Sequence, residues 1–150
     1  MARYFLDSSA LVKRYHHEHG SPDVHLLFNA PENRLVISRL ALVELASCLA
    51  RLVREGVLTD VGFGSLMLRV EADVAVGLLA VAAVSAPRLE EAAELLATHG
   101  LTLNVRTLDA LHLATAQALN RRNRITGFVA ADDKLLKAAA SCGLTVLDVS

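Results

Sequence analysis

Five short apolar runs, separated by longer segments with helical periodicity, constrain the fold of this chain more than any other feature. The runs lie at residues 3–6, 35–37, 78–81, 127–130 and 145–147. Continuous apolar runs of this length are typical of strands that are buried on both faces of a sheet. Because helical segments lie between these runs, the pattern predicts an α/β fold. We expect a mostly parallel central sheet of about five strands, with helices on both faces.

Capping residues mark the ends of the predicted helices. Ser38 precedes a helix that stops at Gly56, and Thr107 is the expected cap of a later helix. Serine and threonine accept hydrogen bonds from the free N–H groups of a helix N-terminus, whereas glycine favours the C-terminus. Further helices are predicted from residue 8, at 21–29, from 59 or 60, from 86 or 87 to 100, and from 132 or 133 to 143.

The composition fits one domain. The chain has 150 residues, 53% of them hydrophobic, and no linker or repeat divides it, so residues 1–150 are taken as one unit. A net charge of −1 excludes the global positive field of a nonspecific nucleic-acid binder. The amino terminus reaches Asp7 before a signal-peptide core is complete, and no apolar stretch is long enough for a bilayer. Cys48 and Cys142 are interpreted as buried free thiols, so we expect a cytoplasmic protein without a membrane segment.

Four acidic residues follow apolar runs or lie inside helices. They are Asp7, Glu44, Asp109 and Asp132. Open parallel sheets bind ligands beyond the carboxyl ends of their strands, and both Asp7 and Asp132 fall at such ends. Carboxylates held together near a core need a counter-charge, and a hard cation such as Mg²⁺ supplies it. The pattern therefore indicates metal-assisted chemistry.

Each acid also has a local structural explanation. Asp7 fits a helix cap, although the serines that follow it offer alternative caps. Glu44 fits a polar helix face, and Asp109 lies where an acid stabilises the helix dipole. One of Asp132 and Asp133 is needed as a helix opener, which leaves the other, taken as Asp132, to reach the cleft. His112, one turn after Asp109, is expected to pack beneath the cleft or to bind a carboxylate.

The order and setting of these segments resemble the PIN-domain family, and in particular its VapC-type toxin branch. The resemblance covers nearly the whole chain, and the segments that carry it are YFLDSSALVK, SRLALVEL, RTLDALHLA, FVAADDKLL and GLTVL. It implies that Asp7, Glu44, Asp109 and Asp132 bind one or two Mg²⁺ or Mn²⁺ ions. It further implies an endoribonuclease toxin that is neutralised by a cognate VapB-type antitoxin and forms a homodimer.

One residue departs from the family pattern. Similar proteins commonly carry threonine or serine two residues before the fourth acid, where this chain has Ala130. We therefore expect Asp7 and Asp109 to ligate the first ion directly, and Glu44 to ligate it or orient its water. Asp132 is expected to contribute mainly to a weaker second ion.

The sequence also suggests where substrate and partner would bind. Arginines that would hold RNA through its phosphates are Arg51, Arg54 and Arg106. Aromatic residues are few, so recognition of the backbone of a structured RNA is expected to outweigh base stacking. The sequence leaves the dimer surface unassigned, and the apolar helix at 61–70, with Phe63, Leu66 and Met67, is one candidate for it.

Three other functions stay open at this point. A phosphoaspartate enzyme of the haloacid-dehalogenase type would place a second aspartate two residues after Asp7, where this chain has Ser9. A metal-free interaction module would use the acids only as helix caps. A PIN-like nuclease for DNA or for RNA processing would act without an antitoxin. The sequence leaves open which RNA is cut, which antitoxin binds, and whether one metal ion or two are used.

Overall fold

The structure is a computed structural model that describes residues 1–150. It contains five strands and seven helices. In chain order they are β1 (Arg3–Leu6), α1 (Ser8–Tyr15), α2 (Ser21–Asn29), β2 (Arg34–Ser38), α3 (Arg39–Arg54), α4 (Asp60–Ala75), β3 (Leu79–Ala82), α5 (Ala86–His99), α6 (Thr107–Asn120), β4 (Gly127–Ala130), α7 (Asp133–Ser141) and β5 (Val146–Asp148). The α/β class predicted from the sequence is confirmed.

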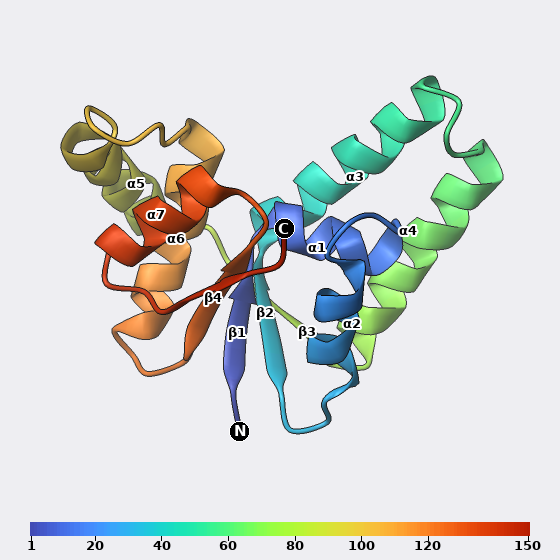
Figure 1. The fold of residues 1–150 in the computed structure, drawn as a ribbon, viewed down its shortest axis with the longest axis horizontal. Helices are drawn as coiled ribbons and strands as arrows, with labels where there is room; N and C mark the ends of the chain where they lie inside the picture. The colour runs from blue at the N-terminus through green and yellow to red at the C-terminus, as the bar shows by residue number, and fades with distance from the viewer.

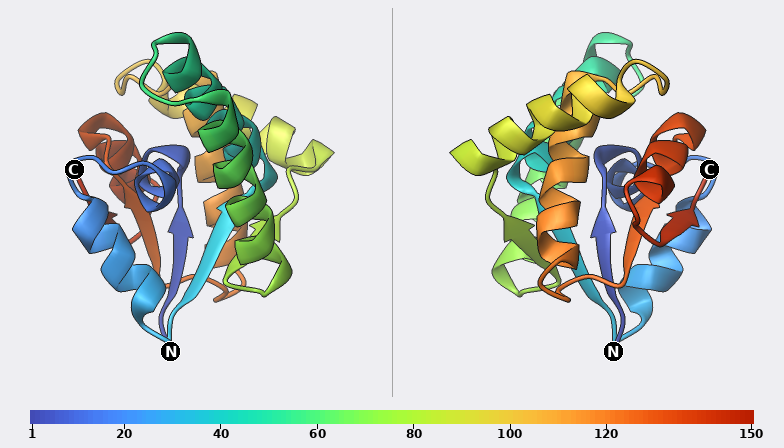
Figure 2. Two further views of the ribbon diagram at one scale, coloured as in Figure 1. Left: turned by 90° about the vertical axis from the view of Figure 1, so that its right-hand side faces the viewer. Right: turned by 90° about the vertical axis from the view of Figure 1, so that its left-hand side faces the viewer.

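The five strands form a single sheet in the order β3-β2-β1-β4-β5, and every pairing is parallel. The sequence predicted a mostly parallel sheet, and it is parallel throughout. The chain builds outward from β1 to β2 and β3, and then continues on the other side of β1 with β4. This reversal places a crevice beyond the carboxyl ends of β1 and β4, where open α/β sheets bind their ligands. Figure 2 shows β1 and β2 pointing the same way, with the amino terminus at the opposite end.

Helices cover both faces of the sheet, as predicted. Successive side chains of a strand point to opposite faces, so Leu6 and Val129 pack against one layer while Phe5 and Phe128 pack against the other. The first layer consists of α1 to α4, and the second of α5, α6 and α7, as Figure 1 shows. The sheet is therefore buried on both sides, which explains why its strands are continuous apolar runs.

Helices α3 and α4 leave the sheet as a packed antiparallel pair (Figure 1). On α4, Phe63, Leu66 and Met67 pack against the core and are only partly buried, whereas Val61 and Leu68 are exposed. Of this candidate dimer surface, only the outward-facing residues of α4 are therefore exposed, and the surface stays a candidate.

Several local expectations change. Thr107 is the first residue of α6, and Arg106 takes the N-cap position that Thr107 was expected to hold. Ser21 is likewise the first residue of α2, which begins after Gly20. Cys48 and Cys142 are free, but they are half-buried rather than buried. None of the helices has both the length and the apolar character needed to span a bilayer.

Candidate metal centre

The four acids lie around the crevice at the carboxyl ends of the central strands. Asp7 links β1 to α1, and Asp132 links β4 to α7. Glu44 lies in the second turn of α3, and Asp109 lies in the first turn of α6. Strand register places Asp7 and Asp132 at the same edge of the sheet, because Leu6, the last residue of β1, pairs with Val129, one residue before the end of β4.

Asp7 is the most buried of the four, with 3% of its surface exposed. Its Oδ1 accepts hydrogen bonds from the Ser9 hydroxyl at 2.7 Å and from the Ala10 N–H at 3.1 Å. Asp7 is therefore itself the cap of α1, and the serines that follow it, which the sequence offered as alternative caps, do not take this role. Burial raises the pKa of Asp7 above its ordinary value of 3.8, although the Ser9 hydrogen bond opposes the change.

Ser9 joins the two strand ends of the crevice. Its hydroxyl donates to Asp7 and accepts from the Ala131 N–H at 2.9 Å, beside Asp132. Ala130, two residues before the fourth acid, is fully buried in the core and offers no hydroxyl. Sequence reasoning missed the link that Ser9 makes between the two strand ends, although a serine two residues after a strand-end aspartate is a usable signal.

Glu44 is held by His112. The Nε2 of His112 hydrogen-bonds Glu44 Oε1, and its Nδ1 lies 3.1 Å from the Ser38 hydroxyl. His112 is 1% exposed. The expected role for this histidine, packed beneath the cleft and bonded to a carboxylate, is confirmed.

Asp109 and Asp132 share one arginine. Asp109 Oδ2 accepts from the Arg106 backbone N–H at 3.0 Å and from its Nε at 3.5 Å. Arg106 Nη2 lies 4.0 Å from Asp132 Oδ2. Asp132 Oδ1 caps α7 by accepting from the Leu135 N–H at 3.0 Å. The cap was expected to be Asp133, but Asp133 is exposed and pairs with Lys137.

The acids thus form two sets, one around His112 and one around Arg106. No three acidic, histidine or cysteine side chains lie close enough together to hold a metal ion in this arrangement. Like charges in a crevice repel, and the guanidinium of Arg106 is the cation present between Asp109 and Asp132.

The donor set nevertheless fits a hard divalent cation. The two side-chain hydrogen bonds of Asp7 go to Oδ1, that of Glu44 goes to Oε1, and those of Asp109 go to Oδ2. Each of these carboxylates therefore keeps one oxygen without a hydrogen-bonding partner. Carboxylate oxygens are the ligands that Mg²⁺ and Mn²⁺ prefer, and Mg²⁺ sites use few protein ligands.

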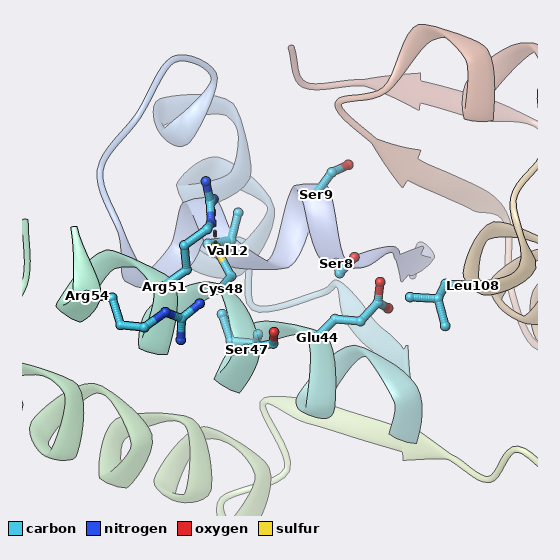
Figure 3. A pocket seen from close by; sticks show the side chains of 10 residues that line it. Ser8, Ser9, Val12, Glu44, Ser47, Cys48, Arg51, Arg54 and Leu108 are labelled. Atoms are coloured by element: carbon cyan, nitrogen blue, oxygen red, sulfur yellow. Dashed lines mark hydrogen bonds between the residues drawn. The ribbon is translucent and has the colours of Figure 1, made fainter.

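A cleft lined by one face of α3 opens beside Glu44. Glu44, Ser47, Arg51 and Arg54 all line it, together with Ser8, Ser9 and Leu108. Figure 3 shows the Glu44 carboxylate directed toward Ser8 and Leu108, with the two arginines farther along the helix. The third predicted arginine, Arg106, lies in an adjoining cleft with Asp109 and Asp132. Asn104 and Lys134 also line this second cleft, and sequence reasoning did not single them out.

Comparison with known proteins gives a consistent fold. The family model of the PIN domain matches residues 4–141. No curated protein sequence matches the chain.

Solved structures show the same fold at low sequence identity. VapC20 of Mycobacterium tuberculosis, a sarcin-ricin loop cleaving toxin, is 17% identical over 95% of this chain and 96% of its own, with a TM-score of 0.67. FitAcB of Neisseria gonorrhoeae is 18% identical over 97% of each chain, with a TM-score of 0.69. VapBC2 of Rickettsia felis, bound to a DNA fragment from its promoter, is 18% identical over 97% of this chain and 98% of its own, with a TM-score of 0.65.

Proposed function

Because the chain belongs to the PIN domain family, we propose that it is a Mg²⁺-dependent endoribonuclease and the toxin of a toxin–antitoxin pair. The observation that carries this proposal is the crevice at the carboxyl ends of β1 and β4. Glu44 lines one cleft at this edge of the sheet, Asp109 and Asp132 line a second, and Asp7 is buried at the end of β1. Asp7, Glu44 and Asp109 each keep one carboxylate oxygen without a hydrogen bond. Capping alone does not require acids from four different elements to gather at one edge of the sheet.

In the proposed site, Asp7 and Asp109 ligate the ion directly. Glu44 ligates it or orients its water, and Asp132 contributes to a weaker second position because its side chain is 39% exposed and engaged by α7. A divalent cation supplies Lewis acidity, which activates water for attack and neutralises charge on the phosphate oxygens. Mn²⁺ should substitute for Mg²⁺, since both accept carboxylate oxygens.

The substrate is proposed to be RNA held mainly through its backbone. Arg51 and Arg54 line the cleft next to Glu44, so a phosphate bound there lies beside the acidic site. No aromatic residue lines either cleft, which disfavours recognition by base stacking. Contacts of this kind predict affinity that falls steeply with salt.

A VapB-type antitoxin partner and a homodimer complete the proposal. Support comes from the solved structures of similar fold, which include a VapBC protein and a FitAB protein bound to DNA fragments. Exposed apolar residues on α4 offer a surface for a second copy.

The direct test is RNA cleavage by the Asp7→Asn variant in the presence of Mg²⁺. Loss of a direct metal ligand should lower the cleavage rate by about 100-fold or more, given that a metal supplies several kcal/mol of transition-state stabilisation. Asp133→Asn is the matched control, because Asp133 is a nearby exposed acid that pairs only with Lys137. Full activity of Asp7→Asn would remove Asp7 from the chemistry. Running single-stranded DNA in parallel distinguishes a ribonuclease from a DNase.

A non-catalytic interaction module is the second candidate. It is favoured by the capping roles of Asp7 and Asp132 and by the absence of a closed ligand group. Calorimetric titration with Mn²⁺ separates the two candidates, because a ligand that binds only the folded state stabilises it. No heat of binding and no rise in melting temperature would favour the module.

A further inference from the structure

We propose that His112 is a positioning residue that fixes the Glu44 carboxylate for the divalent cation, with Ser38 setting the orientation of the imidazole ring. This inference rests on the proposed function and assigns a role to a residue outside the acidic quartet. The three residues come from three elements: Ser38 ends β2, Glu44 lies on α3, and His112 lies on α6.

The proton positions among these three side chains follow from their hydrogen-bond partners. A carboxylate only accepts hydrogen bonds, so the hydrogen between His112 and Glu44 must belong to Nε2. The Ser38 hydroxyl oxygen accepts from the Ala41 N–H at 3.2 Å, which leaves its own hydrogen free to donate. It can donate to Nδ1 of His112, which lies 3.1 Å away. A ring with its hydrogen on Nε2 thus leaves neither Glu44 nor Ser38 without a hydrogen bond.

Packing holds the ring in this orientation. His112 is 1% exposed and Ser38 is fully buried, so neither side chain can turn freely. The edge of the His112 ring meets Phe5, with ring centroids 6.2 Å apart and planes at 68°. Because Ser38 is also the N-cap of α3, the same hydroxyl fixes both the helix that carries Glu44 and the histidine that binds Glu44.

The consequence falls on Glu44. Its long side chain would otherwise sample many rotamers, and ordering it at the moment of metal binding would weaken affinity. The bond from His112 occupies Oε1 and leaves Oε2 without a hydrogen bond. The Glu44 carboxylate lines the cleft and is directed toward Ser8 (Figure 3). Both ring nitrogens of His112 have protein partners and the ring is buried, so it has no means of reaching a substrate. His112 therefore acts through Glu44.

Two substitutions separate the two ring contacts. In His112→Gln, the side-chain amide extends to about the position of Nε2 and keeps a donor for Glu44. In His112→Asn, the shorter amide lies near Nδ1 and keeps only the Ser38 side. Partners that orient metal ligands are worth about 10- to 100-fold in metal affinity. His112→Asn should raise the Kd for Mn²⁺ by about this factor, whereas His112→Gln should stay within about threefold of wild type.

The experiment is calorimetric titration of the full chain with Mn²⁺, with thermal unfolding of each metal-free variant measured alongside. Both histidine variants disturb the core, so a purely structural role predicts equal losses of affinity that follow the loss of melting temperature. Equal Kd values for the two variants would overturn the positioning role.

A double-mutant cycle with Glu44→Ala completes the test. If His112 acts through Glu44, His112→Asn should weaken Mn²⁺ binding no further once Glu44 is absent. Additive losses would overturn the proposal while leaving the nuclease assignment intact. A wild-type protein that binds no Mn²⁺ would overturn both, and this result is distinguishable because it appears before any variant is compared.

Discussion

At the scale of single residues, the ionised carboxylate of Asp7 lowers the stability of the metal-free folded protein. Asp7 is nearly fully buried, and its surroundings satisfy only one of its two oxygens. An ionised carboxylate in such a place is destabilising unless a cation pairs with it. Functional sites commonly show this trade-off: a substitution that removes the buried charge raises stability but also removes the group that the function needs.

Substitution of Asp7 by asparagine should therefore stabilise the metal-free protein at neutral pH. The folded pKa of Asp7 lies above its ordinary value of 3.8, so the folded state binds its proton more tightly than the unfolded chain. Protonated Asp7 therefore adds stability at pH values below its pKa in the unfolded chain. This added stability is lost as the pH rises through the pKa of Asp7 in the folded protein. Every tenfold difference in proton affinity between the two states corresponds to about 1.4 kcal/mol, and asparagine can still cap α1.

The measurement is thermal unfolding in EDTA across a range of pH. Asp7→Asn should melt higher than wild type at pH 7, and the difference should disappear near pH 3, where Asp7 is protonated in both states. A gain that is independent of pH would show that the burial of charge is not its cause.

Arg106 should compete with the metal ion. Its guanidinium pairs with Asp109 and approaches Asp132, but its side chain is 74% exposed, so the pairing is weak. Arg106→Gln should tighten Mn²⁺ binding by about two- to fivefold, the equivalent of an exposed ion pair. The same variant should weaken RNA binding and make the slope of log affinity against log salt shallower by about one.

If Arg106 competes with the metal ion and also holds RNA, Arg106→Gln should tighten Mn²⁺ binding and weaken RNA binding. Arg124→Gln is the control, because Arg124 is exposed and precedes β4, at the amino-terminal end of the strands. It should leave Mn²⁺ affinity unchanged. If Arg106→Gln weakens Mn²⁺ binding, the guanidinium orients the carboxylates and does not compete for them.

At the scale of elements, α3 carries both a core face and a site face. Ala41, Leu45, Leu49 and Leu52 are buried, while Glu44, Ser47, Arg51 and Arg54 line the cleft. The two faces follow the 3.6-residue period, so the packing of the leucines sets the direction of Glu44. The position of Glu44 in the site therefore depends on how firmly the buried face of α3 packs against the core.

Leu49→Ala tests that dependence. Leu49 is fully buried, and removing its side chain should lower the free energy of unfolding by about 2–5 kcal/mol. Val43→Ala lies on the same helix at a position that is 63% exposed, and it should change stability by less than about 0.5 kcal/mol. Chemical denaturation measures both variants. A small loss for Leu49→Ala would mean that α3 is not anchored through this face.

At the scale of the whole molecule, the pair formed by α3 and α4 extends from the sheet and presents apolar residues to solvent. Val61 and Leu68 are 80% and 67% exposed, and they lie seven residues apart on one face of α4. Exposed apolar residues that share a face favour association with a second copy.

The double variant Val61→Glu, Leu68→Glu should shift a homodimer to monomer. Charges buried in an apolar interface are destabilising by several kcal/mol, so the change in oligomeric state should be complete at micromolar concentration. Sedimentation velocity of wild type and variant measures it. A dimer that survives both charges places its interface elsewhere.

The fold was largely predictable because its signals are local. Each strand is a short apolar run, and the runs lie within one residue of the observed strands. Capping was predicted less well. At Arg106 and Asp132 the sequence offered adjacent polar residues, and the choice between them depends on backbone geometry that a propensity does not contain.

The sequence by itself determined the α/β architecture, the strands and the four acids, because periodicity and strand-end position are properties of neighbouring residues. Tertiary structure decided which side chains those acids meet. The bonds from His112 to Glu44 and from Ser9 to Ala131 join residues 68 and 122 positions apart. Strand order and register bring such residues together, and both depend on the packing of the whole chain. For the same reason, only the folded chain shows Arg106 between two carboxylates and the Ser9 hydroxyl bonded to the Ala131 N–H.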